Sequence, residues 1–179
     1  MTIRTFGNFT PEIAAGVYVD PTALVIGQVK IGADSSVWPM TVIRGDINTV
    51  TIGKRTNIQD GSILHVTHDG PYSPGGASLV IGNEVTIGHA ATLHACTLED
   101  NCLIGIGSIV LDGAVVRKHA MLGAGSLVPG GKELEGGYLW MGRPARKMRE
   151  LTEKEIEYLS YSAEHYVKVK QLHDQPDKN

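Results

Sequence analysis

Three histidines, His65, His89 and His94, are the residues of this sequence whose type and spacing could support chemistry. A neutral imidazole nitrogen is the commonest metal ligand in proteins. Three histidines that leave a fourth position open form a zinc site of the catalytic type, whereas structural zinc sites are closed by four protein ligands. The chain has seven histidines, so this interpretation depends on whether the fold brings these three together.

A six-residue repeat indicates how the histidines are positioned. Aliphatic residues recur at every sixth position within four segments of the chain, and a small residue, usually glycine, often follows them. The segments are Val19, Val25, Ile31, Val37 and Ile43; Ile52, Ile58 and Leu64; Ile81, Ile87 and Leu93; and Leu98, Ile104, Val110, Val116, Leu122 and Val128. Neither the helical period of 3.6 nor the strand period of 2 gives this pattern alone.

A hexapeptide repeat is typical of a parallel β-helix. Three hexapeptides form one triangular turn, and each aliphatic side chain points into a narrow axial core. We expect glycine where the chain turns a tight corner after each short strand, because a Cβ atom would be strained there. A β-sandwich of short strands is the alternative, but a sandwich has no reason to keep a six-residue phase. The sequence therefore predicts a mainly β fold.

The repeat places two of the histidines side by side. His65 follows Leu64 and His94 follows Leu93, so both occupy the same position on the same face if the two segments are successive turns. Stacked strands lie about 4.8 Å apart, which lets two imidazoles converge on one ion at about 2.0–2.1 Å. His89 lies on the preceding face, too far to share that ion within one chain. In a three-fold trimer, His89 of a neighbouring subunit could complete the site.

His68 lies in the insertion between two repeat segments, three residues after His65. A histidine there could hang over the site and carry protons, since the unperturbed pKa of an imidazole is about 6.5. An ordinary loop histidine is the alternative interpretation, and the sequence leaves both open.

Composition excludes several functional classes. A net charge of −3 gives no electrostatic footprint for nucleic acid or for an anionic lipid surface. No apolar run approaches the roughly 20 residues needed to cross a membrane, and the first residues lack the apolar core of a secretory signal. Cys96 and Cys102 are too few for a disulfide framework, so we expect reduced thiols and a cytoplasmic location.

The breaks in the repeat suggest three parts of the chain. Residues 1–150 form the β-helix domain, with a lead-in to about residue 15 and an exit after about residue 130. Residues 151–174 form a helix that packs on the β-helix, because Thr152 and Glu155 make a capping box. An apolar face then follows at helical spacing. Residues 175–179 form a tail.

The segments Ile43–Asp46, Asn57–His65 and Gly88–His94 together resemble the γ-class carbonic anhydrases, and most of all the compact, YrdA-like bacterial branch of that family. The resemblance covers nearly the whole chain. It implies a left-handed β-helix packed as a homotrimer. It also implies one divalent metal per site, with zinc first and iron, cobalt or nickel as other candidates, held by three histidines from two chains.

The resemblance also implies roles for neighbouring residues. The position of Gln59 contacts the metal-bound solvent and that of Asn57 helps to position it. The positions of Arg44 and Asp60 form an inter-subunit salt bridge, for which an arginine–carboxylate pair is well suited. Asp46 lies near that pair. The alternative for these three charged residues is a purely structural interface network.

A further candidate for reaching the site is Tyr161 in the C-terminal helix. The implied reaction is hydration of carbon dioxide to bicarbonate by a metal-generated hydroxide. The chain departs from the archaeal members, which carry glutamates where Ile47 and His68 stand here, so the proton route is altered. Two other functions remain open: a metal-binding trimer that serves as an assembly module, and a hexapeptide acyltransferase or thioesterase.

Overall fold

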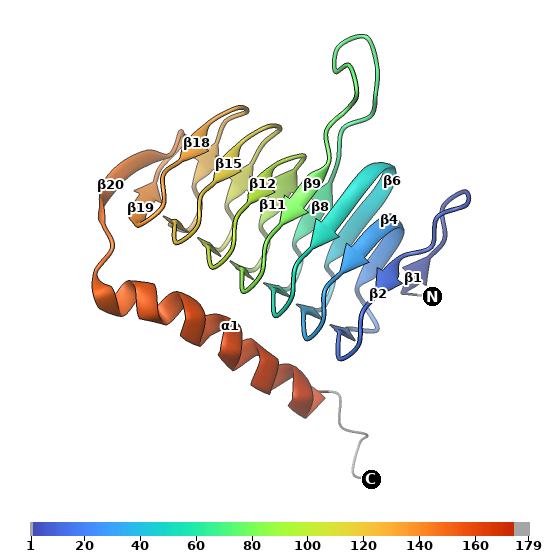
Figure 1. The fold of residues 1–179 in the computed structure, drawn as a ribbon, viewed down its shortest axis with the longest axis horizontal. Helices are drawn as coiled ribbons and strands as arrows, with labels where there is room; N and C mark the ends of the chain where they lie inside the picture. Colours follow the sequence, from blue (N-terminus) through green and yellow to red (C-terminus); the bar gives the residue numbers. More distant parts are fainter. Residues whose placement is uncertain (1, 174–179) are drawn as a thin grey trace.

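The computed structural model describes residues 2–173, which form a parallel β-helix with one long helix beside it (Figure 1). The strands run around three faces, and all of them except the last pair in parallel with strands of neighbouring turns. The predicted mainly β class with a C-terminal helix is confirmed. The proposed tail over 175–179 lies outside the described residues.

Two sheets make up the β-helix. The 12-stranded sheet covers two faces and contains β1 (Ile3–Arg4), β2 (Glu12–Ile13), β4 (Leu24–Ile31), β6 (Val42–Ile52), β8 (Ile63–His65), β9 (Leu79–Ile81), β11 (Thr92–His94), β12 (Thr97–Leu98), β14 (Ile109–Val110), β15 (Val115–Val116), β17 (Leu127–Val128) and β18 (Glu133–Leu134). The 8-stranded sheet is the third face and contains β3 (Tyr18–Val19), β5 (Ser36–Val37), β7 (Asn57–Ile58), β10 (Thr86–Ile87), β13 (Leu103–Ile104), β16 (Met121–Leu122), β19 (Tyr138–Met141) and β20 (Arg146–Glu150).

The register across the 66–78 insertion is the one that the repeat predicts. Ile52 pairs with Ile81 between β6 and β9, and the equivalent isoleucines pair between β7 and β10. Leu64 pairs with Leu93 between β8 and β11, so that His65 pairs with His94. The insertion therefore leaves the coil as a loop and returns without changing its phase.

The aliphatic residues of the repeat fill the axis. From Val25 onward every one of them is at most 2% exposed. The six-residue step also continues beyond the predicted coil, to Leu134 at 0% and Trp140 at 6% exposure. Strands β18 and β19 extend the parallel ladders there, and β1 and β2 pair with β4 at the other end. The coil is thus longer at both ends than the repeat indicates.

The glycines that follow the aliphatic residues have a different cause from the one expected. A Cβ atom on Gly53 would lie 2.5 Å from the carbonyl carbon and oxygen of Gly82 in the next turn, and its φ is not positive. Positive φ angles occur instead at other corner positions, including Arg55 (55°) and Glu84 (56°). Close contact between successive turns, rather than backbone strain, explains these glycines.

The 66–78 insertion projects away from the β-helix (Figure 1). Its neck is closed by two backbone hydrogen bonds, from Thr67 N to Ala77 O (2.9 Å) and from Ala77 N to Thr67 O (3.0 Å). The Asn48 amide also donates to the Thr67 carbonyl (3.2 Å). The base of the loop is therefore fixed to the β-helix.

Helix α1 (Glu153–His173) lies along the 8-stranded face. Its capping box is present, because Thr152 N donates to Glu155 Oε2 (2.9 Å) and Glu155 N donates to Thr152 Oγ1 (3.3 Å). Leu159 and Ala163 are buried against the sheet. Near the end of α1, the buried Lys170 donates to the Gly16 carbonyl. The helix is thus held at both ends.

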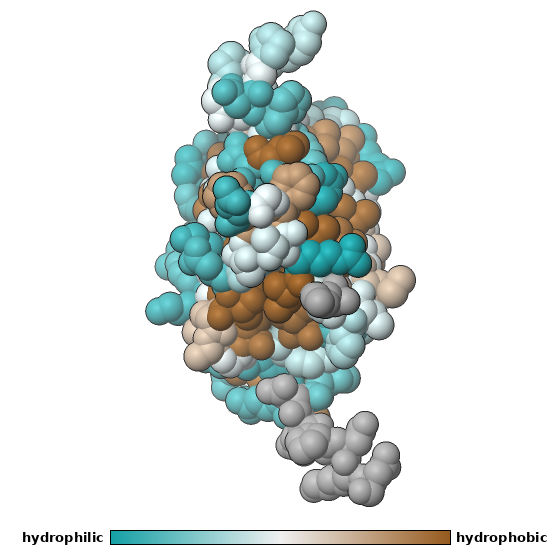
Figure 2. All heavy atoms as spheres, turned by 90° about the vertical axis from the view of Figure 1, so that its right-hand side faces the viewer, coloured by the Kyte–Doolittle hydropathy of each residue, from teal (hydrophilic) through white to brown (hydrophobic). Residues whose placement is uncertain are grey.

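The N-terminal end of the β-helix presents an apolar centre ringed by polar side chains (Figure 2). Exposed large apolar residues in the first strands and their connection are Ile3, Phe6 and Phe9. Among residues 2–173, no helix combines the length and apolar character needed to span a membrane.

Candidate metal centre

His65 ends β8 and His94 ends β11, and their imidazoles face each other across the ladder. Nδ1 of His65 lies 3.2 Å from Nε2 of His94. Two ligand nitrogens on one tetrahedral ion at about 2.0–2.1 Å would lie roughly 3.3 Å apart. The pair is therefore spaced as two ligands of one zinc-type ion.

Each of these imidazoles is held by a carboxylate at its other nitrogen. Nε2 of His65 lies 3.0 Å from Asp46 Oδ1, and Nδ1 of His94 lies 2.6 Å from Asp112 Oδ1. An ionised carboxylate only accepts hydrogen bonds, so these ring nitrogens carry the protons. In a neutral imidazole held in this way, the facing nitrogen keeps the lone pair that can bind a metal. A carboxylate behind each histidine is the arrangement that orients metal ligands.

Both carboxylates are held in the ionised form. Burial acts to raise the pKa of Asp46, but hydrogen bonds from Arg44 and His65 lower it below its usual value. For Asp112, burial again opposes the shift, while hydrogen bonds from Thr67 and His94 lower the pKa. Each carboxylate is therefore available to accept a hydrogen bond from the ring nitrogen that faces it.

His89 lies just after β10, at the edge of another face. Its Nδ1 is 2.8 Å from Asp60 Oδ2, and its side chain is 47% exposed. Within residues 2–173 of one chain, no group of three or more His, Cys, Asp or Glu side chains is arranged to hold a metal ion. One chain thus contributes two facing ligands and, at a separate corner, an exposed third histidine whose Nε2 is turned away from its carboxylate.

Gln59 and Asn57 form a buried polar chain beneath α1. Gln59 Nε2 donates to Asn57 Oδ1 (3.1 Å), and Asn57 Nδ2 donates to Thr86 Oγ1 (3.0 Å). Thr86 Oγ1 in turn lies 3.0 Å from the Ser162 hydroxyl of α1. Because these hydrogen bonds use Nε2 of Gln59, its Oε1 is the amide atom that can still accept a hydrogen bond.

Within one chain, the charged candidates do not form the salt bridge that the family resemblance implies between two chains. Arg44 Nη1 lies 2.5 Å from Asp46 Oδ2, and Asp60 accepts from His89 rather than from Arg44. The salt bridge from Arg44 to Asp60 of a neighbouring subunit stays a prediction. Asp46 is the residue that links Arg44 to His65.

Two candidates lie apart from the facing histidines. His68 is exposed in the projecting loop, and no hydrogen bond or ring contact joins it to His65 or His94 in the described structure. Tyr161 is 60% exposed on α1 and stacks on His165, with ring centroids 6.0 Å apart. Their catalytic roles stay predictions.

Asp112 and Thr67 were not expected from the sequence. Asp112 follows β14, one turn after β11, and Thr67 begins the loop after β8. The available signal was the register, because Val110 pairs with Leu93 and so brings Asp112 to the corner beside His94. A search of the neighbouring turns for carboxylates would have found it.

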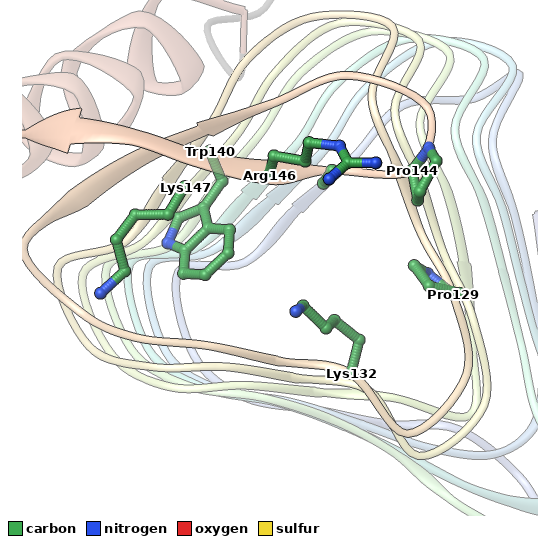
Figure 3. Close-up of a pocket in the computed structure, with 7 residues that line it drawn as sticks. Pro129, Lys132, Trp140, Pro144, Arg146 and Lys147 are labelled. Carbon is green, nitrogen blue, oxygen red and sulfur yellow. The ribbon is translucent and has the colours of Figure 1, made fainter.

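A pocket of about 560 Å³ lies at the opposite end of the β-helix from its first strands (Figure 3). Its lining residues are Pro129, Lys132, Trp140, Pro144, Ala145, Arg146 and Lys147. Lys132 and Lys147 place their ammonium groups 5.6 and 5.8 Å from the Trp140 ring centroid. None of the candidate metal ligands lines this pocket, so it is separate from the histidine pair.

Several named proteins are similar to this chain over nearly its whole length. Protein YrdA of Escherichia coli (strain K12) is 50% identical over 168 residues, which are 94% of this chain and 91% of that protein. A carbonic anhydrase of Geobacillus kaustophilus is 43% identical over 171 residues, covering 96% of this chain and 90% of the relative. Gamma carbonic anhydrase 2, a mitochondrial protein of Arabidopsis thaliana, is 45% identical over 175 residues, which are 96% of this chain and 62% of that longer protein. No protein-family model matches the chain.

Solved structures share the fold along almost the whole chain. A hexapeptide transferase family protein from Anaplasma phagocytophilum gives a TM-score of 0.88 at 41% identity, covering 95% of this chain and 96% of that one. A Bacillus cereus protein, described as a candidate acetyltransferase, gives a TM-score of 0.88 at 38% identity, covering 96% and 95%. Since relatives named carbonic anhydrase match nearly the full length of this β-helix, the chain belongs to the γ-class carbonic anhydrase family of hexapeptide-repeat proteins.

Proposed function

We propose that this protein is a γ-type carbonic anhydrase, which hydrates carbon dioxide to bicarbonate at a site shared between subunits of a homotrimer. The observation that carries the proposal is the histidine pair, whose facing nitrogens lie 3.2 Å apart with a carboxylate behind each ring. The carbonic anhydrase names of close relatives support the reaction. A cytoplasmic location is part of the proposal, because both cysteines are free thiols.

The trimer completes the ligand set. His65 and His94 provide two nitrogens, and a three-ligand zinc site needs one more. His89 is exposed and has its Nδ1 hydrogen-bonded to Asp60, which leaves Nε2 to bind an ion at a neighbouring chain. A cyclic trimer repeats this contact three times, so each interface carries one site.

The chain's own residues then bind and orient the reactants. When bound, zinc or another divalent ion supplies the Lewis acidity that lowers the pKa of water to about 7. Asn57 holds the Gln59 amide so that Oε1 can accept a hydrogen bond from substrate water. Addition of water to carbon dioxide yields bicarbonate and one proton. His68, on the projecting loop, is our candidate for carrying that proton to bulk solvent.

The decisive experiment is stopped-flow carbon dioxide hydration by protein reconstituted anaerobically with zinc or ferrous iron, with metal analysis of the same sample. We expect His94→Ala to lose bound metal and hydration together. His119→Asn is a matched control, because His119 lies in a distant turn with a φ of 62° that asparagine tolerates. A fully metallated trimer without activity above background would contradict the enzyme and favour a metal-binding assembly module.

An acyltransferase is the second candidate, because two solved structures at TM-scores of 0.88 carry transferase descriptions. A single histidine base would suffice for acyl transfer, so this function gives no reason for two facing histidines with carboxylates behind them. Stabilisation by coenzyme A in a thermal-shift assay, together with acyl transfer that survives removal of metal, would favour it over the carbonic anhydrase.

A further inference from the structure

Asp112 contacts two parts of the molecule that are far apart in the sequence. Its Oδ1 accepts from Nδ1 of His94 (2.6 Å), and its Oδ2 accepts from the Thr67 hydroxyl. We propose that Asp112 is a positioning residue that fixes the metal-binding nitrogen of His94 and ties it to the neck of the 66–78 loop. This inference rests on the proposed metal function.

The first part of the inference concerns the proton on His94. A neutral imidazole carries one proton, and a carboxylate 2.6 Å from Nδ1 keeps it there. Nε2 is then free to face His65. Without Asp112, the free imidazole preference for a proton on Nε2 would compete, and that tautomer cannot bind the ion through the facing nitrogen.

The second part concerns charge. Asp46, behind His65, also pairs with Arg44, which offsets its charge. The second partner of Asp112 is the uncharged Thr67 hydroxyl, and within residues 2–173 no lysine or arginine lies within 4.0 Å of it. Among the described residues, His94 is thus the basic side chain that Asp112 contacts. A carboxylate in this position raises the basicity of the ligand histidine.

The third part concerns the loop. Thr67 closes the loop's neck through its backbone bonds to Ala77, and its side chain bonds Asp112. His68 is the next residue. The hydrogen bond from Thr67 to Asp112 thus links the base of the loop that carries His68 to His94 through one carboxylate. Loop position and ligand orientation are set by the same carboxylate.

The test uses the variants Asp112→Ala, Asp112→Asn and Thr67→Val, with Asp100→Ala as the control. Asp100 is also a half-exposed turn carboxylate that accepts side-chain and backbone hydrogen bonds, from Asn83, but it touches no histidine. Zinc affinity is measured by competition with a chromophoric chelator, and the absorption spectrum of the Co²⁺ form reports ligand geometry. Asp112→Asn is close to isosteric and keeps the test valid if the alanine variant does not fold.

We expect Asp112→Ala to lower zinc affinity by about 10–100-fold and to change the Co²⁺ spectrum. Asp112→Asn and Thr67→Val should have smaller effects in the same direction. The control Asp100→Ala should change neither the affinity nor the spectrum. In metal-free protein, long-range ¹H–¹⁵N spectra should show the His94 proton on Nδ1, and more of it on Nε2 in Asp112→Ala. Unchanged affinity, spectrum and tautomer in Asp112→Ala would overturn the inference. Failure of the wild-type trimer to bind zinc or Co²⁺ would instead overturn the proposed function, while the tautomer measurement would still judge Asp112.

Discussion

His65 and His94 face each other through unlike nitrogens, Nδ1 of the first and Nε2 of the second. Although the two residues pair in register, their carboxylates approach from opposite sides of the column. Asp46 comes from the turn before His65, and Asp112 from the turn after His94. Each carboxylate takes the nitrogen on its own side, so the remaining nitrogens point inward between the two rings.

If each metal site is shared between two subunits, co-refolding two different site variants should restore part of the metal binding and activity. His89→Ala retains the facing pair, and His94→Ala retains the third ligand. In a cyclic trimer assembled at random from equal amounts, about a quarter of the interfaces would combine the two intact halves. We expect that fraction of wild-type metal content and hydration after co-refolding, and almost none from either variant alone. As the control, co-refolding His65→Ala with His94→Ala should give no restoration, because both defects lie in the same half-site.

The two cysteines should be inert in the folded protein. Burial raises the pKa of Cys96 to about 12 and that of Cys102 to about 12. Since the thiolate is the reactive form, a chromogenic disulfide reagent should label neither thiol at pH 8 until denaturant is added. Labelling of the native protein at the rate of the unfolded chain would contradict their placement in the core.

The N-terminus of α1 should become less stable in acid. The Arg149 guanidinium and the Thr152 backbone lower the pKa of Glu155 from 4.5 to about 2. Because the folded-state pKa is lowered, the carboxylate stabilises the fold fully above pH 4.5, and this contribution is lost as the pH falls from 4.5 towards 2. Urea unfolding of Glu155→Gln should show a shallower decline over that window than wild type. An identical decline in both proteins would contradict the capping role.

Removing the other half of the cap tests the same helix at neutral pH. Thr152→Ala should lower the free energy of unfolding by about 1 kcal/mol, because the Glu155 backbone N–H loses its partner. Thr152→Ser keeps the hydroxyl and should recover most of that loss in the same urea measurement.

The glycines between successive turns should not tolerate a Cβ atom. Gly53→Ala would place that atom 2.5 Å from the Gly82 carbonyl, and overpacking of this kind costs about 1–3 kcal/mol. Gly70→Ala is the control, since the atoms its Cβ would meet belong only to the His68 side chain, which can move. Thermal unfolding of the two variants should therefore differ, and equal melting temperatures would show that the turns can separate at little cost.

The register could be predicted from the sequence, and with it the pairing of His65 with His94, because inward residues at a fixed period leave little freedom for a strand to shift. The partners around the pair could not, since Asp112 and Thr67 reach it from corners and loops where no period applies. The extension of the core to Leu134 and Trp140 obeys the period, but the glycine-rich segment that begins at Gly130 and Gly131 led us to expect the exit near residue 130.

The last turn of the coil also explains how the repeat can stop. A parallel ladder that ends on an open strand would accept another copy of itself. Here β20 runs antiparallel to β19 along that edge, and its exposed side chains include Arg146, Lys147, Arg149 and Glu150. A strand from a second molecule would meet β20, which runs opposite to the parallel ladder and carries a row of charged side chains. The segment that leads into α1 therefore protects the edge of the 8-stranded face against pairing with the end of another molecule.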